Sequence, residues 1–176
     1  MSDCDQKFFG KYRGTVINNI DPLLQGRILV TVTDVYKFGL SNWAMPCVPI
    51  GGTQSGIFAV PTIGSGVWIE FEQGDPDYPI WVGGFWGSMA DPPVMAQAGV
   101  PAMPNIVMQT IGQNSITLFG TAGAGITLSC GPVMNPLSPK IVITQAGIML
   151  SAGKATITMA ATGQIDFNFG ALTILQ

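Results

Sequence analysis

Gly125-Ile-Thr-Leu-Ser129 recurs as Gly147-Ile-Met-Leu-Ser151, and variants of this pentapeptide fill the last third of the chain. Further units lie at 155–159, 164–169 and 172–175. Within each unit, alternate residues are apolar and the residues between them are small or polar, as a half-buried β-strand requires. Short strands joined by glycine-containing turns at a nearly fixed period are typical of a β-solenoid or β-helix.

A single chain of these units cannot enclose its own apolar side chains. Each unit supplies two or three of them, whereas one coil of a single-chain solenoid takes about 20 residues. Three chains that each form one wall of a triangular prism would bring these side chains together on a common axis. We therefore expect an intertwined trimeric β-helix over 105–176, with Thr, Ser, Asn and Gln in ladders outside. The expected axis residues are Ile116, Leu118, Ile126, Leu128, Ile141, Ile143, Ile148, Leu150, Ile157, Met159, Ile165, Phe167 and Phe169.

Charge is almost absent from this half of the chain. The 176 residues include ten carboxylates and seven Lys or Arg, but only Lys140, Lys154 and Asp166 lie beyond residue 91. Stacked identical positions would place like charges about 4.8 Å apart, which is unfavourable. Low charge alone does not indicate disorder here. Disordered tails combine high charge with low hydrophobicity, whereas 47% of this chain is apolar. No apolar run approaches the roughly 18 residues of a membrane span, and a net charge of −3 does not favour nucleic acid as a partner.

Few residue types with catalytic or metal-binding chemistry are present. The absence of histidine excludes Ser-His-Asp and Cys-His catalytic arrangements and every His-containing metal site. Cys4, Cys47 and Cys130 are widely spaced and odd in number, so we expect neither a disulfide framework nor a zinc site. The first residues lack the apolar core of a signal peptide, which favours synthesis in the cytoplasm. We expect no catalytic residue, no metal and no cofactor.

The first half also has the pattern of an all-β domain. Five strands in about 80 residues fit the small closed barrel of the OB fold, which leaves few sheet edges. The expected strands, bounded by Gly, Pro, Asn or Asp, lie at 10–18, 26–33, 42–48, 66–72 and 80–84. The expected organisation is an arm at 1–9, an OB domain at 10–88, a Pro-rich extended linker at 89–104 and the β-helix at 105–176.

Several short motifs of the first half occur together in order. They include Gly26-Arg27, Asn42-Trp43-Ala44 and Gly64-Ser-Gly66-Val67-Trp-Ile-Glu70-Phe-Glu72-Gln-Gly74-Asp75-Pro-Asp77-Tyr-Pro79-Ile-Trp81-Val-Gly83. The segment from about residue 10 to 88 resembles the OB domain of central spike proteins in contractile phage tails, type VI secretion valine-glycine repeat proteins and related injection systems. The resemblance assigns a structural role to Gly14, Asp21, Gly26, Arg27, Trp43, Pro61, Gly64, Glu70, Phe71, Gly74, Asp75, Pro79, Trp81 and Gly83.

This resemblance implies a non-enzymatic homotrimer at the centre of a baseplate. In such machines the OB domains sit on a hub protein, the β-helix points outward, and sheath contraction drives it transiently through the target envelope. Whether the machine is a phage, a secretion system or an extracellular particle stays open. Some members hold iron at the tip through His-x-His motifs, which this chain lacks. We expect a separate PAAR-repeat protein to cap an apolar platform made by Leu172, Ile174 and Leu175.

Two charged pairs have more than one interpretation. Arg27 would hold Asp21 or Glu70 across a subunit contact, or it would be an ordinary surface residue. Glu70 and Glu72 would share one strand face about 7 Å apart, a spacing that a glycosidase could use. We favour a solvated strand edge for the two glutamates, because no cleft accompanies them.

A binding module is the main alternative to a spike. An OB domain with a β-rod would recognise a surface glycan or nucleic acid by stacking on Trp43, Trp68, Trp81 and Trp86. The surrounding loops carry few cations, so core and subunit-contact roles are favoured for these rings. Asp75 and Asp77 form a carboxylate pair in a turn, but a calcium site needs more oxygen ligands than this turn supplies.

Overall fold

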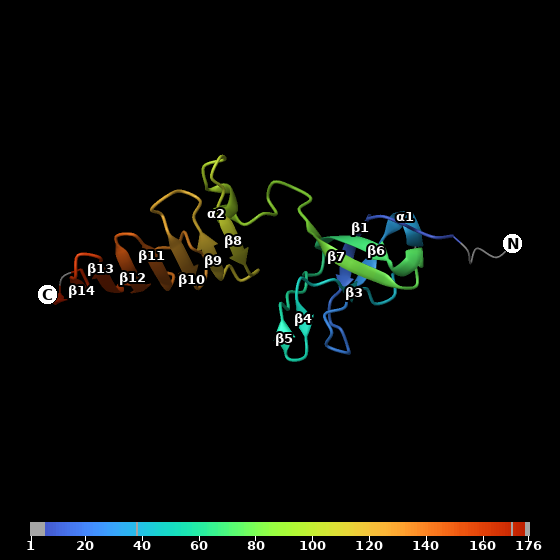
Figure 1. Cartoon of the computed structure of the whole chain (residues 1–176), viewed down its shortest axis with the longest axis horizontal. Coiled ribbons are helices and arrows are strands. Elements are labelled where there is room, and N and C mark those ends of the chain that lie inside the picture. The colour runs from blue at the N-terminus through green and yellow to red at the C-terminus, as the bar shows by residue number, and fades with distance from the viewer. Residues whose placement is uncertain (1–5, 38, 170, 175–176) are drawn as a thin grey trace. The chain divides into compact units, whose positions relative to one another are not determined.

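The computed structural model describes residues 6–37, 39–169 and 171–174, and the all-β class is confirmed. By its internal contacts the chain divides into two units, residues 1–91 and 92–176 (Figure 1). This division falls inside the segment 89–104 that we interpreted as a linker, and most of that segment belongs to the second unit. None of the described helices is long and apolar enough to cross a membrane.

The first unit is an OB-like barrel with the strand order β2-β1-β6-β7-β3. Pairing is antiparallel except between β3 and β7, which run parallel. The barrel closes between β2 and β3, where Ile28 and Ala44 form an antiparallel bridge and the backbone N–H of Val30 donates to Ser41 Oγ at 3.0 Å. The elements are β1 (Tyr12–Asn18), β2 (Leu29–Thr31), α1 (Thr33–Tyr36), β3 (Met45–Pro46), β4 (Gly51–Gly52), β5 (Ser55–Gly56), β6 (Gly66–Phe71), the 3-10 turn η1 (Glu72–Gly74) and β7 (Pro79–Phe85).

Alternation along these strands creates the barrel core. In β6 every second residue is buried, and Val16, Val30, Val67 and Ile69 are fully inaccessible to solvent. The arm contributes as well, because Phe8 packs on this core. Its backbone N–H donates to the carbonyl of Gly74 at 2.8 Å, which fastens the arm beside η1.

The first unit contains elements that the sequence pattern did not indicate. The β4–β5 hairpin consists of Gly, Thr, Gln and Ser, so it has no apolar alternation by which a strand is recognised. The helices α1 and η1 are single turns, too short to show a 3.6-residue period. Each of the five barrel strands nevertheless overlaps an expected strand.

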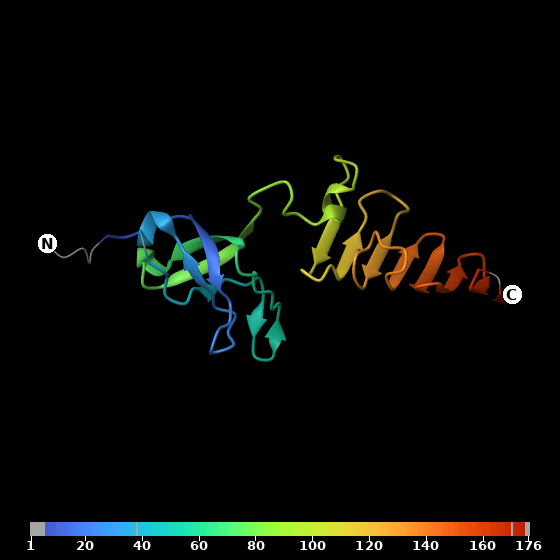
Figure 2. The same ribbon diagram turned by 180° about the vertical axis from the view of Figure 1, so that it is seen from behind.

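The second unit is one eight-stranded antiparallel sheet whose strands follow one another in chain order (Figure 2). Adjacent strands are joined by short turns or loops, so each strand pairs with its neighbours in sequence. A short helix within the expected linker precedes the sheet and packs near β8. The elements are α2 (Val94–Gln97), β8 (Ile106–Gln109), β9 (Ser115–Leu118), β10 (Ile126–Ser129), β11 (Lys140–Thr144), β12 (Gly147–Ala152), β13 (Ala155–Ala160), β14 (Ile165–Phe167) and β15 (Leu172–Ile174).

Packing explains why each copy of the repeated pentapeptide begins with glycine. Gly125 and Gly147 have φ angles of +76° and +144°, which side chains rarely allow. A Cβ atom on either residue would also collide with a backbone carbonyl of the adjacent strand, that of Ile143 or Met159 respectively. The recurrence of Gly in the sequence therefore marks a close approach of two strands.

Candidate interaction surface

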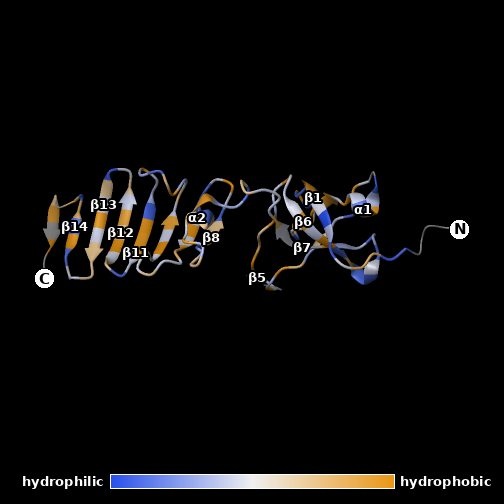
Figure 3. Cartoon of the chain, turned by 90° about the horizontal axis from the view of Figure 1, so that it is seen from above, coloured by the Kyte–Doolittle hydropathy of each residue, from blue (hydrophilic) through white to orange (hydrophobic). Residues whose placement is uncertain are grey.

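The strand register of the second unit aligns apolar residues into two continuous rows on one face of the sheet. We call these rows the apolar ladders, and Figure 3 shows hydrophobic residues on successive strands of this unit. The first ladder is Ile106, Leu118, Ile126, Ile143, Ile148, Met159, Ile165 and Ile174. The second is Met108, Ile116, Leu128, Ile141, Leu150, Ile157, Phe167 and Leu172.

In the isolated chain this apolar face is open to solvent, while the opposite face is buried at β9 and β10 and mostly half-buried on the other strands. Leu118, Ile126 and Ile157 are 37–39% exposed, whereas Thr117 is fully inaccessible. Side chains that are neighbours across adjacent strands bury one another's flanks. The area that stays exposed is therefore the part of each side chain that points away from the sheet. This distribution is the reverse of an ordinary folded domain, in which Ile and Leu are inside and Thr is outside.

Loops of the same chain cover part of the polar face. Lys140, which pairs with Ser129 and Ser151 on that face, donates from Nζ to the carbonyls of Val133 and Asn135 at 3.2 and 3.3 Å. These bonds hold the loop 132–138 on the polar side of the sheet. The chain thus shields its polar face, and none of its described loops shields the ladders from solvent.

The hydroxyl ladders that we expected on the polar face are incomplete as hydrogen-bonded networks. Ser115, Thr117 and Ser151 have buried hydroxyl oxygens without a hydrogen-bond partner. Register alone therefore does not satisfy these groups, even though Ser115 pairs with Ser129, and Thr117 pairs with Thr127.

Every expected axis residue except Phe169 lies in the apolar ladders. Phe169 follows the end of β14, has a φ of +56° and is 84% exposed, so it does not continue the alternation. The pattern missed Ile106 and Met108, which form the first rung, because they follow directly on the Pro-rich segment. The role of these residues at a trimer axis stays a prediction.

The expected cap-protein platform partly coincides with the ladders. Leu172 pairs with Phe167, and Ile174 pairs with Ile165, so these two residues form the last rung. They are 58% and 49% exposed, more than the interior rungs, because no described strand lies beyond them. Leu175 lies outside the described residues, and the binding of a cap protein stays a prediction.

In the first unit, Asp21 organises the loop between β1 and β2. Its carboxylate accepts hydrogen bonds from Arg27 Nε and Nη2 at 3.0 and 2.7 Å and from the backbone N–H groups of Leu23 and Gln25 at 2.9 and 2.8 Å. The Arg27 guanidinium, helped by these N–H groups, holds the pKa of Asp21 well below its usual value. The guanidinium also lies 5.5 Å from the centre of the Trp43 ring. The pair forms within one chain, which corrects the expectation of a subunit contact.

Several other signature residues support the barrel itself. Trp81 is buried, and its indole N–H donates to the carbonyl of Gly26 at 3.1 Å. Gly14 leaves room for Ile69, whose side chain lies 3.0 Å from where a Cβ would stand. These contacts are structural. The other signature residues fill the buried positions Phe71, Gly74 and Pro79, the loop positions Pro61 and Gly64 and the strand irregularity at Gly83.

The carboxylates of this unit are engaged separately. Glu70 forms an ion pair with Lys11, and Glu72 belongs to η1 instead of β6, so the two glutamates do not share a strand face as we expected. Asp75 accepts from the backbone N–H of Asp77 at 3.1 Å. In the described part of the chain, no group of three or more Cys, Asp or Glu is placed to hold a metal ion.

Burial and ring contacts separate the remaining aromatic residues. Tyr36 donates to the carbonyl of Pro76 at 2.5 Å, and burial, reinforced by the charge of Asp77, raises the pKa of Tyr36 to about 12. Trp68 packs on Phe85 with ring centres 5.0 Å apart. Trp86 is mostly exposed. The cysteines Cys47 and Cys130 are exposed free thiols, and Cys4 lies outside the described residues.

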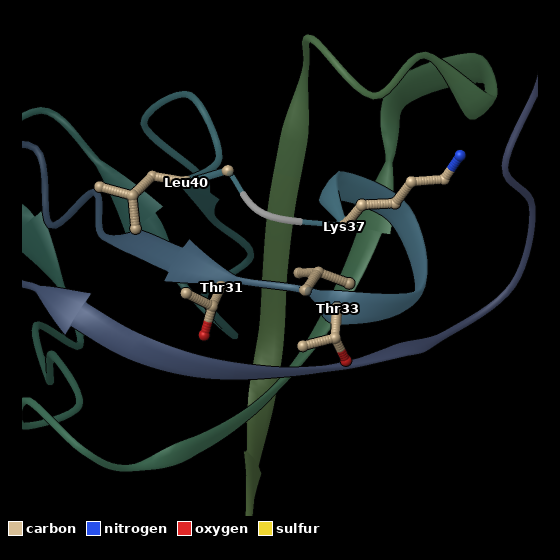
Figure 4. A pocket seen from close by; sticks show the side chains of 6 residues that line it. Thr31, Thr33, Lys37 and Leu40 are labelled. Atoms are coloured by element: carbon tan, nitrogen blue, oxygen red, sulfur yellow. The ribbon is translucent and has the colours of Figure 1, made fainter.

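A shallow pocket beside β2 and α1 lacks catalytic groups. Figure 4 shows Thr31, Thr33, Lys37 and Leu40 around it. Val32 and Gly39 complete the lining. Lys37 is the one titratable residue among these six, so the lining provides no acid–base pair.

Two family models match the chain, one in each unit. The type VI secretion system/phage-baseplate injector OB domain matches residues 12–86, and the phage baseplate V C-terminal trimerisation domain matches residues 105–173. No individual curated protein matches it. The barrel and the repeat sheet coincide with these two domains, and the chain belongs to the family of phage-baseplate and type VI secretion spike proteins.

Proposed function

We propose that this protein is the homotrimeric central spike of a contractile tail or injection apparatus, docking through its OB domains on a hub and puncturing the target envelope on sheath contraction. The observation that supports this most is the pair of apolar ladders, which run through all eight strands of the repeat sheet and are not covered by any described part of the chain. A trimerisation domain matches the same residues. Three such sheets facing inward form the triangular β-helix, with one chain as each wall.

The ladders supply enough apolar surface to drive association. Full burial of an Ile or Leu contributes about 1.5–3 kcal/mol, and most interior ladder residues retain somewhat more than a third of their exposure. Covering that remainder is worth roughly 0.5–1 kcal/mol per residue, or on the order of 10 kcal/mol per chain over both ladders. This is of the size that offsets the lost freedom of association.

The proposed role is mechanical and has no catalytic step. Force applied to the OB end is carried by a sheet in which every strand hydrogen-bonds to its neighbours, and buckling is resisted by a shared apolar axis. The sparse charge of the second unit suits this role, because identical positions of three chains face one another on the axis. At the far end, the exposed last rung is the surface on which we place a PAAR-repeat tip protein.

Oligomeric state is the first test. Light scattering on the purified full chain should give three times the 18.5 kDa mass of one chain, and the trimer should resist SDS without heating. A monomer at micromolar concentration would contradict the proposal, because the ladders would then have no cover.

Docking needs a separate test. The trimer should co-elute on gel filtration with a hub protein and with a PAAR-repeat protein encoded beside sheath and tube genes. Binding of the cap should be lost on changing Leu172→Asp, while binding of the hub should persist. Loss of both together would indicate a folding defect and would count against the assignment of the last rung to the cap.

A further inference from the structure

The first unit also has an apolar surface that none of its described residues covers. It consists of Ile20, Leu23 and Leu24 in the β1–β2 loop together with Ile50, Ile57 and Phe58 beside the β4–β5 hairpin. These six residues, the loop–hairpin patch, are between 51% and 85% exposed. Figure 1 shows the loop and the hairpin projecting from the same side of the barrel, and Figure 2 agrees. Exposed apolar patches of this kind mark contact surfaces more often than scattered single residues do.

Contacts between the two segments make the patch one surface. The Phe58 ring lies 3.2 Å from the position of a Cβ on Gly26 at the base of the loop. Asn19 Nδ2 donates to the carbonyl of Pro61 at 3.0 Å, which ties the start of the loop to the chain leaving the hairpin. The loop and the hairpin therefore hold each other in place.

The loop is built to present its leucines. Asp21 binds the backbone of Leu23 and the side chain of Arg27, and the backbone N–H of Leu24 donates to the carbonyl of Asp21 at 3.0 Å. Leu24 adopts a φ of +55°, an uncommon conformation for leucine that persists only where its surroundings fix it. A leucine held in this way and still 85% exposed contributes nothing to the barrel core.

The lack of net charge on the patch indicates that its occupant is also apolar. No charged residue occurs between Met45 and Ile69, and the one carboxylate of the loop, Asp21, is neutralised by Arg27 at 2.7 Å. A charged partner surface would lose water here without gaining an ion pair.

The short joint between the units favours a neighbouring copy of the chain as the occupant. Only residues 86–91 separate β7 from the second unit, and Asp91 shortens this joint further by accepting from the N–H groups of Gly87 and Ser88. Six residues reach at most about 20 Å, and a domain of about 90 residues has a radius of gyration of about 12 Å. Trimerisation through 105–173 therefore keeps three OB units within reach of one another, at an effective concentration of about 1 mM.

We propose that the loop–hairpin patch packs against the OB unit of a neighbouring copy in the trimer. This inference rests on the homotrimer of the proposed function. In a three-fold ring each copy contributes two different surfaces, so the patch of one copy meets another part of the next OB unit. The contact would join the three barrels into one base that transmits force to all three walls of the spike together.

Photo-crosslinking in the full chain tests this contact. p-Benzoylphenylalanine is placed at position 58, where it replaces an exposed aromatic residue, or at position 78 as the matched control. Tyr78 is also exposed but lies in the turn before β7, outside the patch. Irradiation of the purified trimer without any hub protein should give at least fivefold more crosslinked chains from position 58, mapped by mass spectrometry to residues 6–91 of another copy. Leu24→Asn, which keeps a residue that tolerates positive φ, should lower the yield from position 58 at least threefold and leave the trimer mass unchanged.

The outcomes separate this inference from the proposed function. A trimer with equal yields from positions 58 and 78, with crosslinks only to residues 92–176, or with crosslinks only after a hub is added would overturn the OB contact and leave the spike intact. A monomeric chain would overturn both. A yield that Leu24→Asn does not change would also count against the patch, because random collisions of tethered domains give that result.

Discussion

The two units bury their residues in opposite ways. In the barrel, Val16 is inaccessible while Thr15 beside it is exposed; in the repeat sheet, Thr117 is inaccessible while Leu118 next to it is open. Both units alternate apolar and polar residues, so alternation alone does not tell whether a strand completes its core within one chain. A barrel closes on itself, whereas a meander of three- to six-residue strands has one face left over.

The two units obtain their stability from different sources. The barrel has a core of its own and should fold as a monomer when residues 92–176 are removed. The repeat sheet needs other chains, because most interior ladder residues keep more than a third of their surface exposed until those chains arrive. Substitutions in the sheet should therefore act on association, and substitutions in the barrel on the folding of single chains.

The largest expected effect is on a ladder residue. Ile157→Asn places an amide among the ladders, at a cost of about 3 kcal/mol per chain and roughly 9 kcal/mol per trimer since it occurs three times. Light scattering should show monomers. Thr158→Asn is the matched control, because the adjacent residue points to the opposite face of the same strand, and it should remain trimeric. If both variants stayed trimeric, the apolar face would not be the contact surface.

The next largest expected effect is on the close approach of two strands at Gly147. Gly147→Ala forces a side chain to a φ of +144° and against the carbonyl of Met159, with an expected cost of about 1–3 kcal/mol per chain. Gly153→Ala also has a positive φ, of +60°, but has open space around its Cβ position, so it should cost less. The SDS-resistant trimer should dissociate at a lower temperature for Gly147→Ala than for Gly153→Ala. Equal shifts would mean that neither the close carbonyl of Met159 nor the less favourable φ of Gly147 lowers the stability.

The sequence predicted the ladders well in their interior and poorly at their ends. Ile126, Leu128 and Ile143 lie within strands that alternate regularly, so counting by two finds them. Phe169 fits the same count but lies beyond β14, where the backbone turns to positive φ. Ile106 lies two residues after Pro104 and was not recognised. The ladders end where strand pairing stops. Pairing depends on two segments together, so the sequence of one segment does not show where it stops.

In the barrel, motif recognition gave the residues but not all of their contacts. Arg27 had two carboxylate candidates, and only the folded loop brings Asp21 to it at 2.7 Å while Lys11 pairs with Glu70. The β4–β5 hairpin left no signal because its residues are small or polar. Its apolar flanks, Ile50 and Phe58, are separated in sequence from the β1–β2 loop that they join, so the loop–hairpin patch could not be read from spacing.

A pH series tests how much the charge of Asp21 contributes to the stability of the barrel. The pKa of Asp21 is lowered in the folded chain, so its stabilising pairing is complete above the unfolded value of about 4 and is lost as pH falls below it. Asp21→Asn should lower barrel stability at pH 7, and its difference from the unchanged chain should shrink toward pH 3. Fluorescence reports this unit specifically, because Trp43, Trp68, Trp81 and Trp86 all lie in it. A difference that is constant with pH would exclude a role of the charge.

The smallest effect has the opposite sign and tests which face of the sheet meets the other chains. Thr117 is inaccessible and its hydroxyl has no hydrogen-bond partner, so Thr117→Val should stabilise the trimer by up to about 1 kcal/mol per chain. Thr144→Val removes a hydroxyl that accepts from the N–H of Ala146 at 3.2 Å and should destabilise it by about 0.5–1.5 kcal/mol. Denaturation of the trimer at fixed chain concentration measures both. If Thr117→Val were destabilising, its hydroxyl would have gained a partner on assembly, and the polar face would then be the one that other chains contact.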